Sequence, residues 1–309
     1  MQTNLLLRKG LAVGIILLFV GTGIIPSTAQ DLEKPPQPTS RGHWLYVGGS
    51  GPGNYTHIQE AINNASNGDT VFVYHGFYNE GRIYINKAIN LIGENRNNTI
   101  IDSTGYVSSL YVWDNVKISG FTIQNAGKEI CVFAQGNNIT ISQNIICNNG
   151  DSAICLYIGD HNQIFDNILR NNEYGIAIQY SDDNEIHDNQ IINNKKFGIL
   201  LEYNRNNRIF SNNISENNVG VALYHETLTV ITKNNIYDNL VNNYFEGIGA
   251  NKWKKNYFGS TTFGPKLIGG KIQILVGWQI SFEGWLDPVY KYIPWIQFDW
   301  NPAKEPYDI

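Results

Sequence analysis

The sequence predicts an all-β protein, a parallel β-helix built from short strands. Three observations support this prediction: a repeat of 22 to 24 residues, apolar columns that follow the repeat, and asparagine at its turns. Asparagine accounts for 41 of the 309 residues, whereas charged residues make up only 16%, below the about 25% usual in soluble domains. A fixed period of this length is the signature of a solenoid.

The repeat is clearest in a four-residue motif that begins with isoleucine and ends with asparagine. Its asparagines follow one another at intervals of 22 or 23 residues: Asn144, Asn167, Asn189, Asn212 and Asn234. A second, apolar column keeps the same spacing: Ile154, Ile176, Ile199 and Val221. Apolar and other residues alternate over a few positions and then break at Asn or Gly, which indicates short strands and turns.

Stacked coils explain the asparagines, because the same position recurs about every 4.8 Å along the axis. We expect the five asparagines of the motif to form a ladder of amide hydrogen bonds. A second ladder is expected at Asn148, Asn171, Asn193, Asn217 and Asn239. Seven isoleucine positions, from Ile92 through Ile118 to Ile231, predict about seven coils and a rod of about 30–35 Å.

The N-terminus has the pattern of a secretory signal peptide over residues 1–30. It carries only Arg8 and Lys9 as charges, then an apolar run and a small-residue exit; the alternative is an uncleaved membrane anchor. Residues 31–41 form a Pro-rich linker. We therefore expect a secreted or cell-surface protein, with the β-helix and its N-terminal cap over 42–250 and a C-terminal cap over 251–309.

Both ends of such a rod need caps, because they leave sheet edges exposed. Thr56 to Gln59 resembles a capping box, and it is expected to start a short helix that ends near Ala65. The C-terminal segment breaks the repeat, holds five of the seven Trp and is rich in Gly and Pro. It is predicted to be an irregular cap, and a docking role for its Trp residues stays open.

Several motifs resemble a known superfamily. They are Ile58-Gln-Glu-Ala-Ile62, Gly68-Asp-Thr-Val-Phe-Val73, Ile85 to Glu94, the Asn-x-Ile-x-x-Asn coils and Trp253-Lys-Lys-Asn-Tyr-Phe-Gly259. Together they resemble the right-handed, pectate-lyase-like β-helix of carbohydrate-binding proteins and sugar hydrolases, and within it the NosD-like group. The resemblance covers about residues 45–265 and implies a right-handed fold. It is weak for function, because this fold hosts lyases, hydrolases, adhesins and binding modules.

The NosD-like resemblance implies copper, whose soft sites use Met, Cys and His. Met1 is the only methionine and falls in the predicted leader, and the six histidines show no paired spacing. We therefore predict no metal cofactor. Calcium at the clustered carboxylates of Asp160, Asp182 and Asp183 is the alternative.

Two cysteines raise the question of a disulfide. Cys131 and Cys155 are 24 residues apart and both lie between apolar neighbours, so they are expected to stack on adjacent coils. A spacing near 4.8 Å would permit a disulfide, although two free thiols fit equally well. Cys147 has no predicted partner.

Polar and aromatic residues at one turn of the coils are the candidate site. The resemblance to lyases and hydrolases makes acids with a nearby base the catalytic candidates: Asp160, Asp182, Asp183, Glu202 and Arg205. Stacking and hydrogen-bonding residues beside them are the candidates for binding a sugar: Tyr157, Gln179, Tyr180, Tyr203, Tyr224 and His225. The alternative interpretation is that all of these are solvated turn residues.

These patterns favour a monomeric, exported protein that binds carbohydrate at the cell surface without cleaving it. A polysaccharide lyase or glycoside hydrolase is the first alternative, and a structural envelope scaffold is the second. A net charge of −5 with no basic run argues against a nucleic-acid partner. After the leader, no stretch is long and apolar enough to predict a membrane span.

Overall fold

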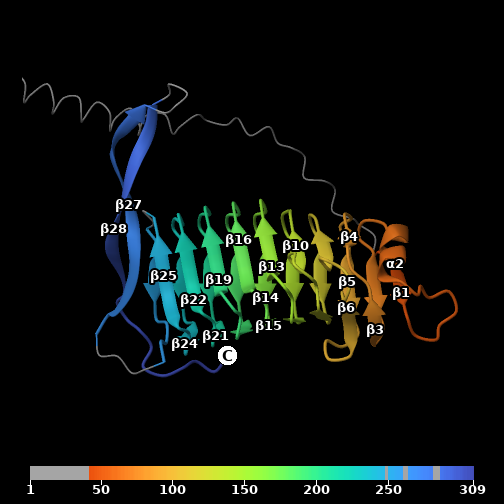
Figure 1. Ribbon diagram of the computed structural model, residues 1–309. Helices are drawn as coiled ribbons and strands as arrows, with labels where there is room; N and C mark the ends of the chain where they lie inside the picture. The colour runs from red at the N-terminus through yellow and green to blue at the C-terminus, as the bar shows by residue number, and fades with distance from the viewer. Residues whose placement is uncertain (1–41, 248–249, 260–263, 281–285) are drawn as a thin grey trace, which may run out of the picture. The chain divides into compact units, whose positions relative to one another are not determined.

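The computed structural model describes residues 42–309 except 248–249, 260–263 and 281–285, and the side chains of residues 273–290 are not described either. The predicted leader and linker lie outside the described residues. From residue 42 on, the chain winds into coils of short strands, each paired in parallel with the equivalent strand of the next coil (Figure 1). This is the predicted all-β solenoid, with one short helix among the described residues.

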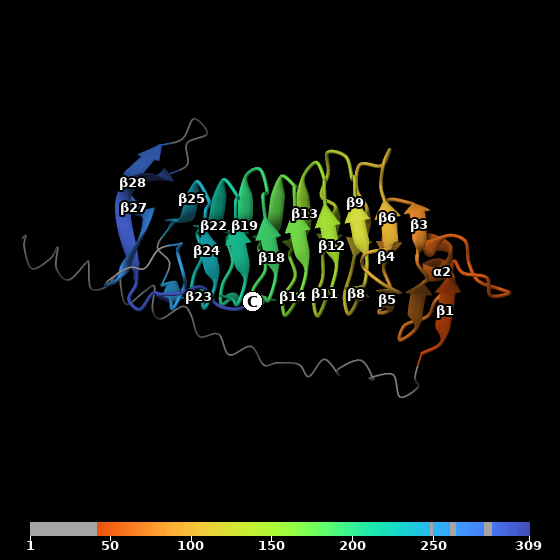
Figure 2. The same ribbon diagram turned by 90° about the horizontal axis from the view of Figure 1, so that it is seen from below.

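Three ladders of strands run the length of the solenoid. The first contains β1 (Trp44–Val47), β2 (Thr70–Val73), β5 (Asn90–Gly93), β8 (Lys117–Ser119), β11 (Thr140–Ser142), β14 (Gln163–Phe165), β17 (Glu185–His187), β20 (Arg208–Phe210), β23 (Val230–Thr232) and β26 (Lys252–Lys254). The second contains β4 (Ile83–Ile85), β7 (Leu110–Val112), β10 (Val132–Ala134), β13 (Ser152–Tyr157), β16 (Tyr174–Gln179), β19 (Phe197–Glu202), β22 (Val219–Tyr224) and β25 (Val241–Glu246). The third, seen in Figure 2, contains β3 (Gly76–Asn79), β6 (Thr99–Asp102), β9 (Thr122–Gln124), β12 (Ile145–Cys147), β15 (Ile168–Arg170), β18 (Gln190–Ile192), β21 (Asn213–Ser215) and β24 (Asn235–Tyr237).

The coils number about ten, so the prediction of about seven was too low. The first ladder alone holds the ten strands from β1 to β26 in the described part of the chain, which makes the stack about 43 Å long. The isoleucine column was counted too short because other apolar residues occupy its ends. Leu91, rather than Ile92, pairs with Ile118, and Trp253 follows Ile231.

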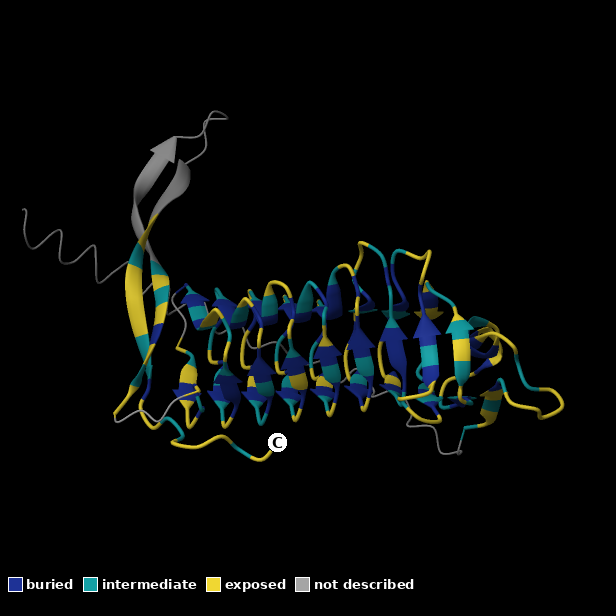
Figure 3. Cartoon of the chain, turned by 60° about the horizontal axis from the view of Figure 1, so that its bottom comes forward, coloured by how far each residue is buried: buried dark blue, intermediate teal, exposed yellow. Residues whose placement is uncertain are grey.

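Both predicted apolar columns are confirmed as the core. Ile154, Ile176, Ile199 and Val221 are register partners in successive long strands and are fully buried. Figure 3 shows the buried residues repeating from coil to coil. A small residue precedes this column for a steric reason: a Cβ at Gly198 would lie 2.7 Å from the Gly220 carbonyl oxygen and 2.8 Å from Ile214, which is closer than packed atoms allow.

The asparagines of the repeat motif form a continuous, buried hydrogen-bonded ladder. Each Oδ1 accepts hydrogen bonds from the backbone amide and the Nδ2 of the asparagine one coil earlier, at 2.9–3.2 Å. The ladder runs past Asn234 to Asn256. It ends at Asp299, whose carboxylate accepts from the backbone amide and Nδ2 of Asn256. Buried polar groups that would otherwise be costly are satisfied in this way.

The second predicted ladder is displaced by one residue at three of its five positions. Its members are the buried Asn149, Asn172, Asn194 and Asn217 and the half-buried Asn239, joined by equivalent hydrogen bonds. Asn148, Asn171 and Asn193 precede them with positive φ and bond to one another by their side chains on the outside. Since Asn tolerates left-handed backbone, each Asn-Asn pair supplies one turn residue and one buried rung.

The N-terminal end is covered by helix α2 (Ile58–Asn64), which buries Ile58, Ala61 and Ile62. The predicted capping box is absent, because the N-cap residue is His57 and makes no side-chain capping bond. Glu80 caps the helix instead, accepting from the backbone amides of Ile58 and Gln59 at 2.9 and 3.3 Å. A carboxylate at a helix N-terminus satisfies free amides and complements the helix dipole.

The C-terminal end is more regular than predicted. Strands β27 (Lys266–Ile280) and β28 (Leu286–Asp299) form a long antiparallel hairpin that extends beyond the long strands (Figure 1). At its base, β27 pairs with β25 and β28 pairs with β26. The sequence predicted an irregular cap because this segment breaks the repeat and is rich in Gly and Pro, which usually interrupt strands.

Candidate functional site

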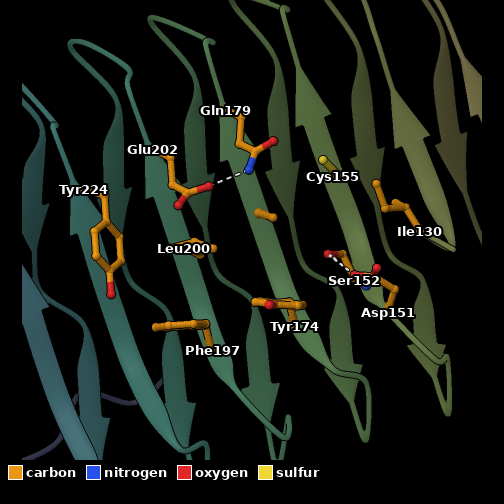
Figure 4. Close-up of a pocket in the computed structure, with 11 residues that line it drawn as sticks. Ile130, Asp151, Ser152, Cys155, Tyr174, Gln179, Phe197, Leu200, Glu202 and Tyr224 are labelled. Atoms are coloured by element: carbon orange, nitrogen blue, oxygen red, sulfur yellow. Dashed lines mark hydrogen bonds between the residues drawn. The ribbon is translucent and has the colours of Figure 1, made fainter. Parts of the chain in front are cut away.

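A groove crosses the outer face of the long strands β13, β16, β19 and β22. We call this hollow the outer groove; its volume is about 400 Å³. Figure 4 shows its lining residues. They are Ile130, Asp151, Ser152, Cys155, Tyr174, Ala177, Gln179, Phe197, Leu200, Glu202 and Tyr224.

The floor of the outer groove consists of small and apolar side chains. Cys155, Ala177 and Leu200 are register partners in three neighbouring strands and are buried. They alternate with inward residues such as Ile176 and Ile178, so the pleat turns them to the outer face. A floor of this kind lets a ligand approach the sheet closely.

One wall of the outer groove is aromatic. The rings of Tyr174 and Phe197 are parallel within 10°, with centroids 5.7 Å apart. In Figure 4 both rings are seen edge-on, side by side, with one face turned toward Leu200 and the opposite wall. The ammonium of Lys196 lies 2.7 Å from the Glu173 carboxylate, 3.3 Å from the Tyr174 hydroxyl and 5.2 Å from the centre of the Tyr174 ring. The wall therefore presents flat apolar faces next to a neutralised charge pair.

The opposite wall is polar. One register column carries Tyr157, Gln179, Glu202, Tyr224 and Glu246 in five successive strands. Gln179 Nε2 donates to Glu202 Oε2 at 2.5 Å. Burial raises the pKa of Tyr224, and the carboxylates of Glu246 and Glu202 on either side raise it further. This wall is thus rich in hydrogen-bonding groups and negative in potential.

A second hollow of about 270 Å³ continues the outer groove over the preceding coils. It shares Ile130 and Asp151 with the outer groove and adds Tyr111, Lys128 and Glu129, among others. Together the two hollows reach from β7 to β22, which is about 24 Å along the axis. The surface is long enough for several sugar units in a row.

Three of the predicted binding residues form a separate row beside the polar wall, which we call the aromatic ridge. It consists of Tyr180, Tyr203 and His225, which follow the long strands at positive φ. Tyr203 lies nearly parallel to both neighbours, with centroids 5.5 Å from Tyr180 and 4.7 Å from His225. Tyr180 and Tyr203 are about half exposed. The remaining predicted residues, Tyr157, Gln179 and Tyr224, belong to the polar wall.

The predicted acidic residues do not converge on one point. Asp160 Oδ1 accepts from the backbone amide of Asp182, and Asp182 Oδ1 accepts from that of Arg205, both at 2.7 Å. Asp183 accepts from Asn206 on the exposed surface. These side chains connect one turn to the next, and only Glu202 lies in the outer groove.

The expected stacking of Cys131 and Cys155 is wrong. Val132 pairs with Ile154 and Phe133 with Cys155, so the two cysteines do not share a register position. Cys131, Cys147 and Cys155 are all free and buried. Burial raises the pKa of Cys131 and of Cys155 to about 12, so these thiols stay protonated at ordinary pH.

The described residues contain no group of three or more His, Cys, Asp or Glu side chains that could hold a metal ion. Within the same residues, no helix has the length and apolar character needed to cross a bilayer.

The sequence pattern missed Tyr174, Phe197 and the floor of the outer groove. Tyr174 stands two positions before inward Ile176, so simple alternation would place it in the core. The pairing of strands β13, β16 and β19 passes over Gly175 and Gly198, and this irregularity leaves the two rings partly exposed. The 23-residue spacing of the two aromatic residues was the one available signal.

Comparison with solved structures supports the same architecture at low sequence identity. A polygalacturonase from Erwinia carotovora ssp. carotovora has a TM-score of 0.57 and 11% identity, covering 73% of this chain and 80% of that one. Pectate lyase Pel9A has a TM-score of 0.53 and 13% identity, covering 70% of both chains. Pectate lyase Bsp165PelA from Bacillus sp. N165, in complex with trigalacturonate, has a TM-score of 0.50 and 14% identity, covering 74% and 86%.

Comparison with curated protein sequences gave no match. A family model did match. Its description is "Periplasmic copper-binding protein (NosD)", and it covers residues 62–271, more than half of the chain. This range takes in the coils from helix α2 to the base of the hairpin. The resemblance found in the motifs is therefore confirmed, and the chain, a right-handed parallel β-helix of the pectate-lyase-like kind, belongs to the NosD family.

Proposed function

We propose that this protein binds a polysaccharide along the outer groove, without cleaving it, outside the cytoplasm. The observation that carries the proposal is the elongated groove in which the faces of Tyr174 and Phe197 lie opposite Gln179 and Glu202. Sugar rings have apolar faces and hydroxyl edges, so an aromatic wall opposite a polar wall suits them. The carbohydrate-related titles of proteins with the same fold agree with this proposal, as does the periplasmic description of the family.

Copper has no part in the proposal. The thiols of Cys131 and Cys155 are buried and protonated, the only methionine is Met1, and no metal-binding cluster occurs among the described residues. A soft metal needs several such ligands converging on one point. The residues present do not fit the copper site that the family description implies.

Glycoside hydrolysis is the second candidate. Glu202 and Glu246 occupy the same register column on either side of Tyr224. Two coils separate their backbones by about 9.6 Å, close to the carboxylate separation of about 6.5–9.5 Å used by inverting glycosidases. This is the arrangement that would support cleavage.

One experiment separates the two candidates. The protein is incubated with neutral, acidic and amino polysaccharides, with and without calcium, and both retained binding and newly formed chain ends are measured. We expect binding without new ends. New reducing ends that disappear in Glu202→Gln would establish a glycosidase, new unsaturated ends would establish a lyase, and no binding to any polymer would favour a structural scaffold.

The location is tested with Phe197→Ala. Loss of an aromatic contact that buries apolar area costs about 1.5–3 kcal/mol, so we expect the dissociation constant to rise about tenfold or more. Phe77→Ala is the matched control, because Phe77 is equally aromatic and 63% exposed on the third ladder. If Tyr203→Ala weakens binding and Phe197→Ala does not, the ligand lies on the aromatic ridge instead.

A further inference from the structure

The charges around the outer groove are unbalanced. Among the described residues, the larger hollow is lined by the carboxylates of Asp151 and Glu202 and by no Lys, Arg or His. Glu246 extends the polar wall by one coil. The adjoining hollow adds Glu129 together with one ammonium, that of Lys128. Lys196 borders the aromatic wall, where it donates to the Tyr174 hydroxyl at 3.3 Å and is paired with Glu173 at 2.7 Å.

The carboxylates of Asp151, Glu202 and Glu246 all influence side chains of the outer groove. Asp151 and Glu202 both raise the pKa of Cys155 on the floor, after the larger effect of burial. Glu202 and Glu246 both raise the pKa of Tyr224 at the far end. The floor and both ends of the outer groove therefore lie in a negative potential, next to ring faces that also attract cations.

This arrangement repels one class of sugar and attracts another. A uronate chain would bring a carboxylate on every sugar unit against Asp151 and Glu202, in a hollow whose described lining holds no cation, and this is unfavourable in a partly desolvated groove. A protonated amine would find an acceptor in Glu202 or Asp151 and an aromatic face in Phe197, whereas Tyr174 already has the ammonium of Lys196 over its ring.

We propose that the outer groove selects a glycan carrying protonated amino groups, such as a polymer of unacetylated hexosamine, over neutral and uronate glycans. This inference rests on the proposed binding function and names its ligand class. Asp151 and Glu202 bind the amines, while the rings of Tyr174 and Phe197 pack against the sugar faces.

The test compares three oligosaccharides of matched length: glucosamine, N-acetylglucosamine and galacturonate oligomers. Binding is measured at about pH 5.5, where amines are protonated and carboxylic acids in general are mostly ionised. The first two ligands share a backbone and differ in charge. We expect the glucosamine oligomer to bind about tenfold more tightly than its N-acetylated counterpart at low salt, with a smaller difference at about 0.2 M salt, and the galacturonate oligomer to bind weakest.

The variants Glu202→Gln and Asp151→Asn keep the shape of each side chain and remove its charge. Each should reduce the ratio of the affinity for the glucosamine oligomer to that for the N-acetylated oligomer about threefold or more. Glu216→Gln is the matched control, because it removes the same charge from an exposed turn beyond β21. Thermal unfolding of each variant shows that it is folded.

The outcomes separate this inference from the function on which it rests. Equal or tighter binding of the N-acetylated or galacturonate oligomer overturns the charge preference and leaves polysaccharide binding intact. A preference that Glu216→Gln reduces as much as Glu202→Gln would mean that the net charge of the chain attracts amines, and it overturns the assignment to the groove. Failure of all three oligomers and of neutral glucans to bind contradicts the proposed function itself.

Discussion

The buried carboxyl of Glu226 predicts that this protein loses stability as pH rises. Glu226 is 1% exposed and occupies a rung that carries Ser181 and Asn204 in the preceding coils. Its Oε1 accepts from the backbone amide and Nδ2 of Asn204, and its Oε2 accepts from the Thr229 hydroxyl. Burial raises the pKa of Glu226 to about 7, and nearby Asp182 adds to the shift, while the hydrogen bonds oppose it.

The sign of the effect follows from where the proton is held. Below about pH 4.5 the carboxyl is protonated in both the folded and the unfolded chain, so its full contribution to the free energy of unfolding is present. Between about pH 4.5 and 7 the folded chain holds a proton that the unfolded chain releases, and the free energy of unfolding falls as pH rises. A shift of this size corresponds to about 3 kcal/mol, lost by about pH 8.

Glu226→Gln removes the titration and keeps the shape of the side chain. The amide oxygen can still accept from Asn204, and the amide nitrogen can donate to the Thr229 hydroxyl oxygen. We expect the variant to match the wild type near pH 4.5 and to exceed it by as much as about 3 kcal/mol near pH 8. For a domain of this size that is a rise in Tm of about 6–12 °C.

Thermal and urea unfolding followed by circular dichroism at about pH 4.5, 6 and 8 would measure the difference. Glu216→Gln removes a carboxyl from an exposed turn and is the control for the loss of one charge. A constant difference between wild type and Glu226→Gln across this range, or a variant that is less stable near pH 8, would refute the reasoning.

Three further predictions concern the coils. Asn189→Ala removes the hydrogen bonds that its side chain makes to the amide of Asn167 and the carbonyl of Ile164, so it should lower the free energy of unfolding by about 3 kcal/mol; Asn218→Ala, at an exposed position outside the positive-φ turns, should change it by less than about 0.5 kcal/mol, and similar losses in urea titrations would count against the ladder as a source of stability. Ile158 is β-branched at φ 52° and 55% exposed; Ile158→Asn should raise the free energy of unfolding by about 1 kcal/mol, and a lower Tm would show that the turn is not strained. The three buried thiols should not react with iodoacetamide in the folded chain at about pH 8 and should all react in denaturant without prior reduction; a thiol that reacts only after reduction would indicate a disulfide.

The repeat made the core of this protein predictable. The apolar columns recur in many consecutive coils, so each position is supported by several independent residues, and one exception does not obscure the pattern. Interactions that occur once had no such support. Glu80 caps a helix that begins 22 residues earlier, and Asp299, the last residue of β28, accepts the final hydrogen bonds of an asparagine ladder. Neither contact recurs along the sequence, so no spacing could predict it.

Register was the weakest part of the prediction. The coils differ in length by a residue or two at their turns, so a spacing alone does not establish which residues pair. The 24 residues between Cys131 and Cys155 suggested stacking, but Val132 pairs with Ile154 across a 22-residue coil. A slip of one residue moves a side chain to the opposite face of a strand. The same error affected the second asparagine ladder. Tyr174 and Phe197 each stand two positions before an inward isoleucine, so alternation placed both rings of the aromatic wall in the core.

Construction from equivalent rungs has a consequence for how such a surface evolves. Each wall of the outer groove gains one residue with every coil, and each coil is anchored to its neighbours by the same apolar columns and asparagine bonds. Duplication of a single 22- or 23-residue unit would lengthen the groove by about 4.8 Å and leave the existing rungs undisturbed. The number of coils therefore determines the length of ligand that the groove can hold. A substitution in one coil changes the side chain that the groove presents there without altering the other coils.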